Sequence, residues 1–123
     1  MNIPSFDPER NYLVSIVDKL ESIEHIEEYI RDMQEVEFSQ NQAIQDAVIH
    51  RVQIIGEAGG KIPNEIRIQF SQIPWSKIVA MRNLIIHDYA KVDEGEVWRV
   101  VKNELPKLKS QLEEVKKYFE QPI

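Results

Sequence analysis

The chain has 123 residues, enough for one compact domain, and its 42% hydrophobic and 29% charged residues are typical of a globular rather than a disordered protein. It contains no cysteine, which excludes disulfides, thiolate catalysis and cysteine-ligated zinc or iron–sulfur sites. The net charge of −6 argues against a protein that coats nucleic acid through electrostatic attraction.

The charge is distributed unevenly along the chain. Residues 1–40 hold ten acids and three bases, whereas residues 77–109 hold seven bases and five acids. A local site for an anion in the second half is therefore compatible with the acidic total. No apolar run is long enough to cross a bilayer, and the first residues lack the pattern of a secretion signal, so we expect a cytoplasmic protein.

The first predicted helix covers residues 8–37, with Asp7 as its cap and Pro8 in its first turn. His25 lies among several glutamates of this helix. A solvated acidic face is favoured over a metal site there, because no second histidine follows at the third or fourth position. Apolar residues recur at helical spacing along one face: Leu13, Ile16, Leu20, Ile23, Ile30 and Met33.

A second helix is predicted over residues 42–59, with Ser39 or Asn41 as its N-cap. His50 lies beside its apolar positions and is interpreted as a packing or hydrogen-bonding residue. Gly56 lies inside the helix, which indicates close packing against another element. The apolar face consists of Ile44, Val48, Val52 and Ile55.

The second half of the chain contains a connector and two further helical stretches. One short helical turn is expected over residues 64–70, and a helix over residues 75–89 follows Pro74. The last stretch starts with Asp93 as its cap, and Pro106 in its middle predicts a kink or break just before it. Its continuous apolar seam consists of Val97, Val101, Leu105, Leu108, Leu112, Val115 and Phe119.

No segment alternates apolar and polar residues convincingly enough to form a sheet. The sequence therefore predicts an all-α fold, an antiparallel four-helix bundle with an extra short helix, in a single domain covering residues 1–123. The long first helix and the last seam also offer a face for a homodimer. Trp75 and Trp98 occupy apolar helical positions and are interpreted as core residues.

One short segment concentrates an arginine, an amide, a histidine, a carboxylate and a phenol: Arg82, Asn83, His87, Asp88 and Tyr89. On an ideal helix Arg82 and His87 lie about 140° apart around the axis, so one straight helix does not direct both to one atom. Either the helix ends near His87, or the pair faces a groove that another element or subunit completes. Equally, this segment fits an ordinary helix end, in which His87 caps carbonyls and Tyr89 packs in the loop.

The order Arg82-x4-His87-x-Tyr89 resembles the motif of HEPN-domain proteins, and more closely that of HepT toxins from MNT–HEPN toxin–antitoxin pairs. The HEPN pattern is R-x(4–6)-H, often with a polar residue directly after the arginine, as Asn83 is here. The resemblance covers nearly the whole chain. Three flanking segments are also similar to that family in order and spacing: residues 54–58, 73–75 and 97–106.

The resemblance implies an all-helical homodimer in which two copies of the motif meet in one cleft. It implies metal-independent endoribonuclease activity with Arg82 and His87 as catalytic residues, and neither a cofactor nor a metal ligand is expected. It also implies a cognate nucleotidyltransferase as antitoxin. In characterised members of the family the antitoxin adds AMP to the motif tyrosine, which is Tyr89 here.

The chemistry of RNA cleavage is compatible with these side chains. Attack by the 2′-hydroxyl needs a base, an acid at the leaving 5′-oxygen and positive charge at the phosphorus. Histidine serves both proton transfers because its pKa of about 6.5 populates both forms near neutrality, and arginine binds phosphate through a planar fork. A symmetric dimer supplies two of each. Asn83 is expected to orient Arg82 or bind ribose, and Asp88 to hold the tautomer of His87 or cap the turn.

Two other interpretations are open from the sequence. The first is a non-catalytic helical module that binds a nucleotidyltransferase partner, and such a module has no chemical need for both Arg82 and His87. The second is a small four-helix scaffold with no enzymatic role, which a monomeric state in solution would favour. RNA cleavage that depends on His87 distinguishes the ribonuclease hypothesis from both.

Overall fold

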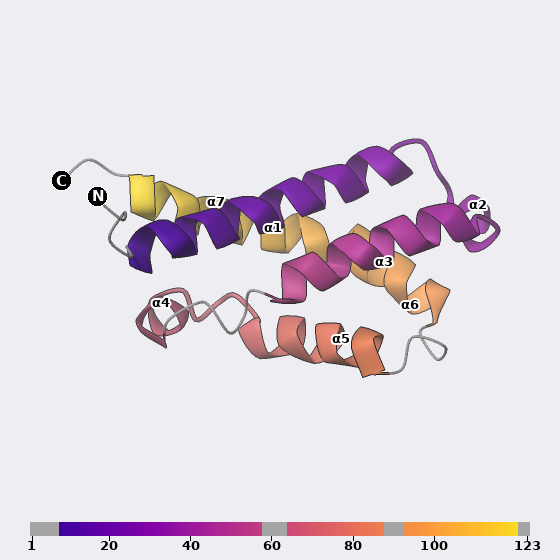
Figure 1. Cartoon of the computed structure of the whole chain (residues 1–123). Coiled ribbons are helices and arrows are strands. Elements are labelled where there is room, and N and C mark those ends of the chain that lie inside the picture. The colour runs from indigo at the N-terminus through magenta and orange to yellow at the C-terminus, as the bar shows by residue number, and fades with distance from the viewer. Residues whose placement is uncertain (1–7, 58–63, 88–92, 121–123) are drawn as a thin grey trace, which may run out of the picture.

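The computed structural model describes residues 8–57, 64–87 and 93–120, and these contain helices and no strand, which confirms the predicted all-α class. The elements in chain order are α1 (Pro8–Ile30), α2 (Glu35–Ser39), α3 (Gln42–Glu57), α4 (Asn64–Gln69), α5 (Trp75–His87), α6 (Glu94–Arg99), the π-helix η3 (Val100–Glu104) and α7 (Leu105–Glu120). Four of them are long, and the short ones lie at the two ends of the molecule (Figure 1).

The four long helices form an antiparallel arrangement (Figure 1). Helix α3 runs back along α1, and α5 runs back along α3 on the side away from α1. Helix α7 returns along α1 in the opposite direction. Helix α1 therefore packs along two long helices, α3 and α7. Among the described residues, helix α5 packs along only one long helix, α3.

The core is aliphatic and follows the predicted faces closely. Large side chains from α1, α3 and α7 form one buried cluster, and Phe70, Val97 and Trp98 pack against its edges. Trp75 and Ile78 extend the cluster to α5. The buried members from the three predicted seams are Ile16, Leu20, Ile23, Ile30, Val48, Val52, Ile55, Val101, Leu105, Leu108, Leu112 and Val115.

The first helix is shorter than predicted, because α1 ends at Ile30 and a separate helix α2 begins at Glu35. The Glu37 carboxylate accepts a hydrogen bond of 3.1 Å from the Gln34 backbone N–H, which caps the new helix. This local contact competes with continuation of the long helix. Phe38 of α2 is buried, so the break turns an aromatic ring into the core.

Two of the predicted caps are present. The Asn41 side chain accepts a hydrogen bond of 3.1 Å from Ile44 N–H at the start of α3, and Asp93 accepts one of 2.8 Å from Gly95 N–H at the start of α6. Ser39, the other candidate for α3, instead donates to the carbonyl of Val36 within α2. Asparagine and aspartate satisfy N–H groups that a helix start leaves unpaired.

The irregularity expected before Pro106 is a π-helix and not a break. In a π-helix each hydrogen bond spans five residues instead of the four of an α-helix. At the end of η3 the Leu105 N–H accordingly donates to the carbonyl of Val100. Helix α7 then continues without interruption. The apolar seam therefore continues through the proline, with Val101 and Leu105 both buried.

Both tryptophans lie against the core, as predicted. Trp75 is buried and its indole N–H donates to the carbonyl of Phe70 at 3.2 Å. Trp98 is partly buried beside Phe38, with the ammonium of Lys102 above its ring. Within the described part of the chain, no helix combines the length and the apolar character needed to span a membrane.

Candidate active site on helix α5

The predicted catalytic pair lies on the C-terminal half of α5, which extends from Trp75 to His87. Arg82 and His87 are therefore both helical positions, and helical geometry separates them by about 140° around the axis. The structure describes the side chains of Arg82 and Asn83, and of His87 only the backbone. Asp88 and Tyr89 lie outside the described residues.

The Arg82 side chain is partly buried, and its guanidinium has two different edges. Its Nη1 donates a hydrogen bond of 3.0 Å to Oδ1 of the exposed Asn83 side chain. Its Nε is buried and, among the described residues, has no hydrogen-bond partner. The Asn83 side chain thus contacts the arginine, and its predicted roles in orienting Arg82 or binding ribose stay predictions. A buried N–H without a partner is costly and uncommon in folded proteins, and the Ser15 and Ser22 hydroxyls are likewise unpaired within the described residues.

The stem of Arg82 lies against the last turn of α3. An added Cβ on Gly56 would be 2.2 Å from the Cβ of Arg82, 2.9 Å from its Cγ and 3.1 Å from the carbonyl oxygen of Ile78. Only a residue without a side chain permits this approach. The close helix packing predicted for Gly56 is confirmed, and its partner is the candidate catalytic arginine.

The same turn of α3 is held from the other side by a residue that the sequence reading missed. Lys19 of α1 is only 1% exposed, and its ammonium donates to the carbonyl oxygen of Ile55. Lys19 belongs to a buried polar stripe on α1 that also contains Ser15 and Ser22. The sequence pattern already indicated that Lys19 is buried, because position 19 falls on the same helix face as Ile16 and Ile23.

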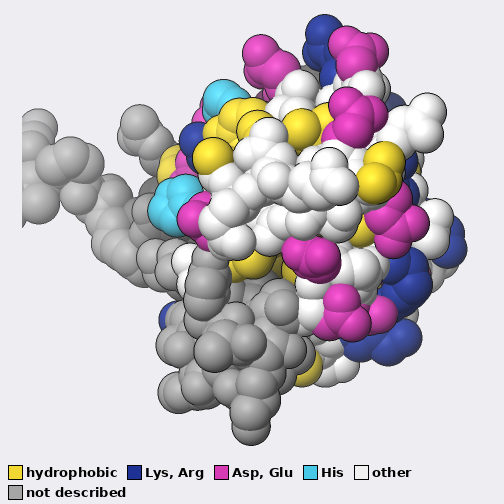
Figure 2. Space-filling view, turned by 90° about the vertical axis from the view of Figure 1, so that its right-hand side faces the viewer, with side chains coloured by type: hydrophobic (Ala, Val, Ile, Leu, Met, Phe, Trp, Pro, Cys, Tyr) yellow, Lys and Arg dark blue, Asp and Glu magenta, His cyan; other side chains and the backbone are white. Residues whose placement is uncertain are grey.

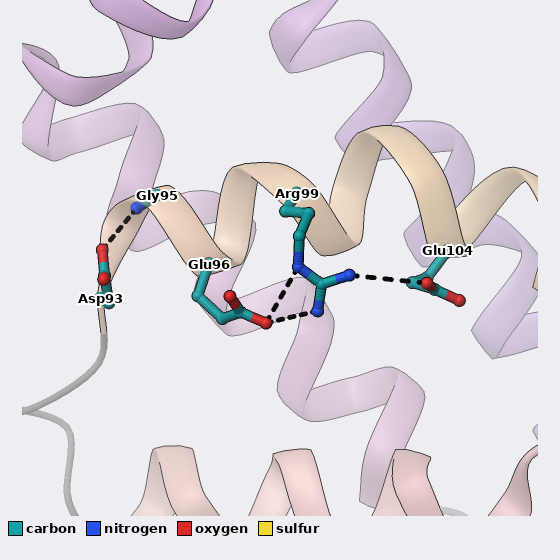
Figure 3. A network of polar contacts seen from close by, with 5 residues as sticks. All are labelled: Asp93, Gly95, Glu96, Arg99 and Glu104. Carbon is teal, nitrogen blue, oxygen red and sulfur yellow. Dashed lines mark hydrogen bonds and ion pairs between the residues drawn. The ribbon is translucent and has the colours of Figure 1, made fainter.

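A network of polar contacts along α6 and η3 engages another arginine, Arg99 (Figure 3). Arg99 donates to Glu96 and forms an ion pair of 3.6 Å with Glu104. The Glu96 hydrogen bond raises the pKa of Arg99, and the same hydrogen bond lowers the pKa of Glu96. Arg99 is thus matched by two carboxylates, whereas no carboxylate pairs with the Arg82 guanidinium within the described residues.

Acidic side chains spread over the end of the molecule that carries α2 and α6, among hydrophobic ones (Figure 2). The C-terminal end of α5 points toward this same end (Figure 1). A polyanion that approaches this end therefore meets acidic side chains interspersed with basic ones. Such a surface limits unspecific association with nucleic acid.

The other two histidines lie outside this region of α5. His25 is exposed and stacks on Tyr29 at 6.2 Å between ring centroids, in agreement with a solvated face. His50 is exposed on α3, so the packing role predicted for it is wrong, while the hydrogen-bonding role stays a prediction. In residues 8–57, 64–87 and 93–120, no group of three or more histidine, aspartate or glutamate side chains is arranged to hold a metal ion.

Comparison with known sequences adds the decisive observation. The family model described as Ribonuclease HepT-like matches residues 19–115, which include the segment from Arg82 to Tyr89. The chain belongs to the HepT-like ribonuclease family. The resemblance inferred from the motif and its flanks is confirmed at the level of the family.

Individual relatives agree with this assignment. A Thermococcus cleftensis protein named "Probable ribonuclease HepT" is 37% identical over 108 residues, covering 88% of this chain and 98% of its own length. A Methanocaldococcus jannaschii protein named as a candidate RNase is 38% identical over 104 residues, or 85% of this chain and 95% of its own.

A further relative is a longer protein of Methanocaldococcus jannaschii, named as a gamma-glutamylcyclotransferase and candidate RNase. It is 47% identical over 93 residues, which are 76% of this chain but only 42% of that protein. The match with this HepT-like chain therefore covers less than half of the fused relative. No solved structure matches the chain.

Proposed function

We propose that this member of the HepT-like ribonuclease family is a metal-independent endoribonuclease that acts as a homodimeric toxin. The observation that carries the proposal is the family match over residues 19–115, which contains Arg82 and His87 in the spacing of the motif. The partly buried Arg82 supports it, since its guanidinium keeps an unpaired buried N–H beside an exposed amide.

In this proposal Arg82 binds the scissile phosphate and His87 transfers protons. Arginine remains charged at neutral pH and donates parallel hydrogen bonds to two phosphate oxygens. As negative charge develops on the phosphorane, those hydrogen bonds strengthen and lower the barrier. One histidine removes the proton of the 2′-hydroxyl, and a second, protonated histidine donates to the leaving 5′-oxygen. Asp88 fixes the tautomer of His87.

The two histidines come from two subunits. Within one chain, Arg82 and His87 lie about 140° apart on a helix, which does not converge on one phosphate. Helix α5 packs extensively on α3 and, in the described residues, has no comparable contact with α1 or α7. A second copy that covers the remaining side of α5 brings the symmetric motif into one composite cleft.

The partner in this proposal is a cognate nucleotidyltransferase that acts as the antitoxin and adds AMP to Tyr89. Tyr89 follows His87 by two residues, so a group attached to its hydroxyl lies close to the proposed cleft. The attached AMP carries a negative phosphate and considerable bulk. It therefore excludes RNA by like-charge repulsion and by sterics.

The first experiment is cleavage of mixed RNA in EDTA by the wild type and by His87→Ala and Arg82→Ala. We expect cleavage by the wild type alone, with 2′,3′-cyclic phosphate ends, and dimers for all three proteins by light scattering. Undiminished cleavage by His87→Ala would exclude this active site. Absence of cleavage by a wild type whose intact mass carries no AMP would favour the non-catalytic binding module.

The composite cleft is tested by subunit mixing. Wild-type protein is equilibrated with increasing His87→Ala protein, and cleavage is measured per wild-type subunit. Mixed dimers contain one histidine, so activity per wild-type subunit should fall as mixed dimers replace wild-type dimers. A constant activity per wild-type subunit would show that each subunit works alone.

The antitoxin part of the proposal has a separate test. Wild type and Tyr89→Phe are each incubated with ATP and a nucleotidyltransferase of the MNT type. We expect the wild type to gain the mass of AMP and lose cleavage, while Tyr89→Phe gains no mass and continues to cut. Inactivation of Tyr89→Phe together with a mass increase would place the modification on another residue.

A further inference from the structure

Gly56 of α3 contacts Arg82, the residue that binds the scissile phosphate in the proposed function. We propose that Gly56 is a positioning residue for Arg82, an inference that rests on that proposed function. Because it has no side chain, the last turn of α3 approaches the Cβ and Cγ of Arg82 closely. The backbone of α3 thereby fixes where α5 presents the guanidinium.

The glycine is required for space and not for an unusual backbone conformation. No glycine among the described residues has φ in the left-handed region, so Gly56 does not form a left-handed helix cap. The atoms that a methyl group would strike are the stem of Arg82 and the carbonyl oxygen of Ile78. The Cβ of Arg82 and the carbonyl oxygen of Ile78 are fixed to the backbone of α5, so these two atoms cannot yield without movement of that helix.

The last turn of α3 is held on its opposite side, which determines which helix yields. Ile55 is fully buried and its carbonyl accepts a hydrogen bond from the buried ammonium of Lys19 on α1. Helix α5 has no comparable second support among the described residues. A side chain at position 56 therefore displaces Arg82 and leaves α3 in place. Relief of a 2.2 Å contact requires a movement of about 1 Å, and such a misplacement can cost about 100-fold in rate.

Hydrogen exchange at the Arg82 guanidinium can measure this displacement. In the present packing the Arg82 Nε is buried, and Nη1 is directed to Asn83 Oδ1 at 3.0 Å. A shift of the Arg82 stem away from Gly56 moves the guanidinium out of the packing in which Nε is buried. Hydrogen exchange at Arg82 Nε, observed by NMR and assigned by its absence in Arg82→Lys, therefore follows the position of the side chain independently of cleavage.

The test compares Gly56→Ala with Gly95→Ala. Gly95 is the matched control because it is also helical, and an added Cβ there meets only the Asp93 carboxylate, at 3.2 Å. We expect Gly56→Ala to remain a folded dimer, to lose about 100-fold in kcat on RNA with a smaller change in KM, and to exchange Arg82 Nε–H faster. Gly95→Ala should match the wild type in all three measurements.

Wild-type kcat together with wild-type exchange at Nε in a folded Gly56→Ala protein would overturn the proposal. If Gly56→Ala does not fold, Lys19→Met removes the support of the Ile55 carbonyl without adding a side chain at the contact. That variant should lose several-fold in kcat and exchange Nε–H faster, and unchanged values would equally overturn the proposal. If wild-type protein does not cut RNA, the proposed function fails, while the exchange measurement still decides whether Gly56 places Arg82.

Discussion

Helices α1 and α5 are built from similar apolar residues but are supported very differently. Helix α1 packs along both α3 and α7, and Ile16, Ile23 and Ile26 are completely buried. Helix α5 is shorter, packs extensively on α3 alone among the described residues, and meets it through a glycine. The comparison indicates that α1 contributes more than α5 to the packing of the chain, because α1 is supported on two sides and the described part of α5 mainly on one.

The two helices also bury different polar groups. On α1 a buried lysine donates to a main-chain carbonyl of α3, which ties two long helices together. The buried hydroxyls of Ser15 and Ser22 on the same helix, like the buried Arg82 Nε on α5, have no hydrogen-bond partner within the described residues. Unpaired buried polar atoms therefore occur on both helices, and the difference between the helices lies in how many neighbours each packs against.

The largest expected effect is on the catalytic rate of a variant of α5 whose stability stays close to that of the wild type. His87→Ala should lower kcat for RNA by about 10²-fold to 10⁴-fold, because it removes a proton-transfer group. Its free energy of unfolding, measured in urea at fixed protein concentration, should change far less than that of a core variant of α1. A loss of stability that accounts for the loss of cleavage would remove the distinction between the two helices.

A truncation on α1 should do the reverse. Ile23→Ala removes a fully buried side chain between α1 and its neighbours and should destabilise the protein by about 2–5 kcal/mol. The control is Val14→Ala on the same helix, where the side chain is 52% exposed. Cleavage per folded dimer should be unchanged in both. A reduced kcat of folded Ile23→Ala would mean that α1 also shapes the active site.

A variant at the N-cap of α6 measures how much the capping hydrogen bond contributes to the free energy of unfolding. Asp93→Ala removes the carboxylate that accepts from Gly95 N–H and should cost about 1 kcal/mol. Asp93→Asn retains an acceptor and should be close to the wild type. Urea unfolding followed by circular dichroism measures both. Equal destabilisation by Ala and Asn would point to the charge, through the helix dipole, rather than to the hydrogen bond.

The smallest expected effect concerns the ion pair that joins α7 to α1. Lys109 lies 3.1 Å from Glu27, and their hydrogen bond raises the pKa of the Lys109 ammonium. A raised lysine pKa stabilises the fold below the unfolded pKa, and this contribution disappears as pH rises through the folded pKa. Glu27→Gln should cost about 0.2–1 kcal/mol at pH 7, because the pair is partly exposed.

The pH series provides the check for that pair. The difference in unfolding free energy between wild type and Glu27→Gln should shrink as the pH becomes strongly alkaline. It should also shrink with added salt. A difference that grows with pH would contradict the assignment of the shift to Lys109.

Local patterns predicted the helices well but missed one helix end, which depends on a local contact that the residue types do not announce. The seams of α3 and α7 and the caps Asn41 and Asp93 follow from spacing and residue type. The end of α1 at Ile30 did not, because Gln34 is not a preferred cap and its bond to Glu37 forms only when the chain turns. The long apolar period continued past that turn and concealed it.

The candidate site shows the same division. The motif made Arg82 identifiable from sequence, and Gly56 indicated that some helix approaches closely. That these two positions contact one another depends on how α5 packs on α3, about which spacing within either helix is uninformative. Asp88 and Tyr89 lie outside the described residues, so their roles stay predictions.

The burial of Lys19 also makes its amine a chemical probe for opening of the helix bundle. Amine-reactive reagents label exposed lysines such as Lys77 and Lys107 at once, whereas a side chain with 1% exposure reacts only after α1 separates from α3. The rate at which this one amine is acylated therefore counts openings of the native state. A ligand that slows acylation of Lys19 would therefore lower the rate at which the bundle opens.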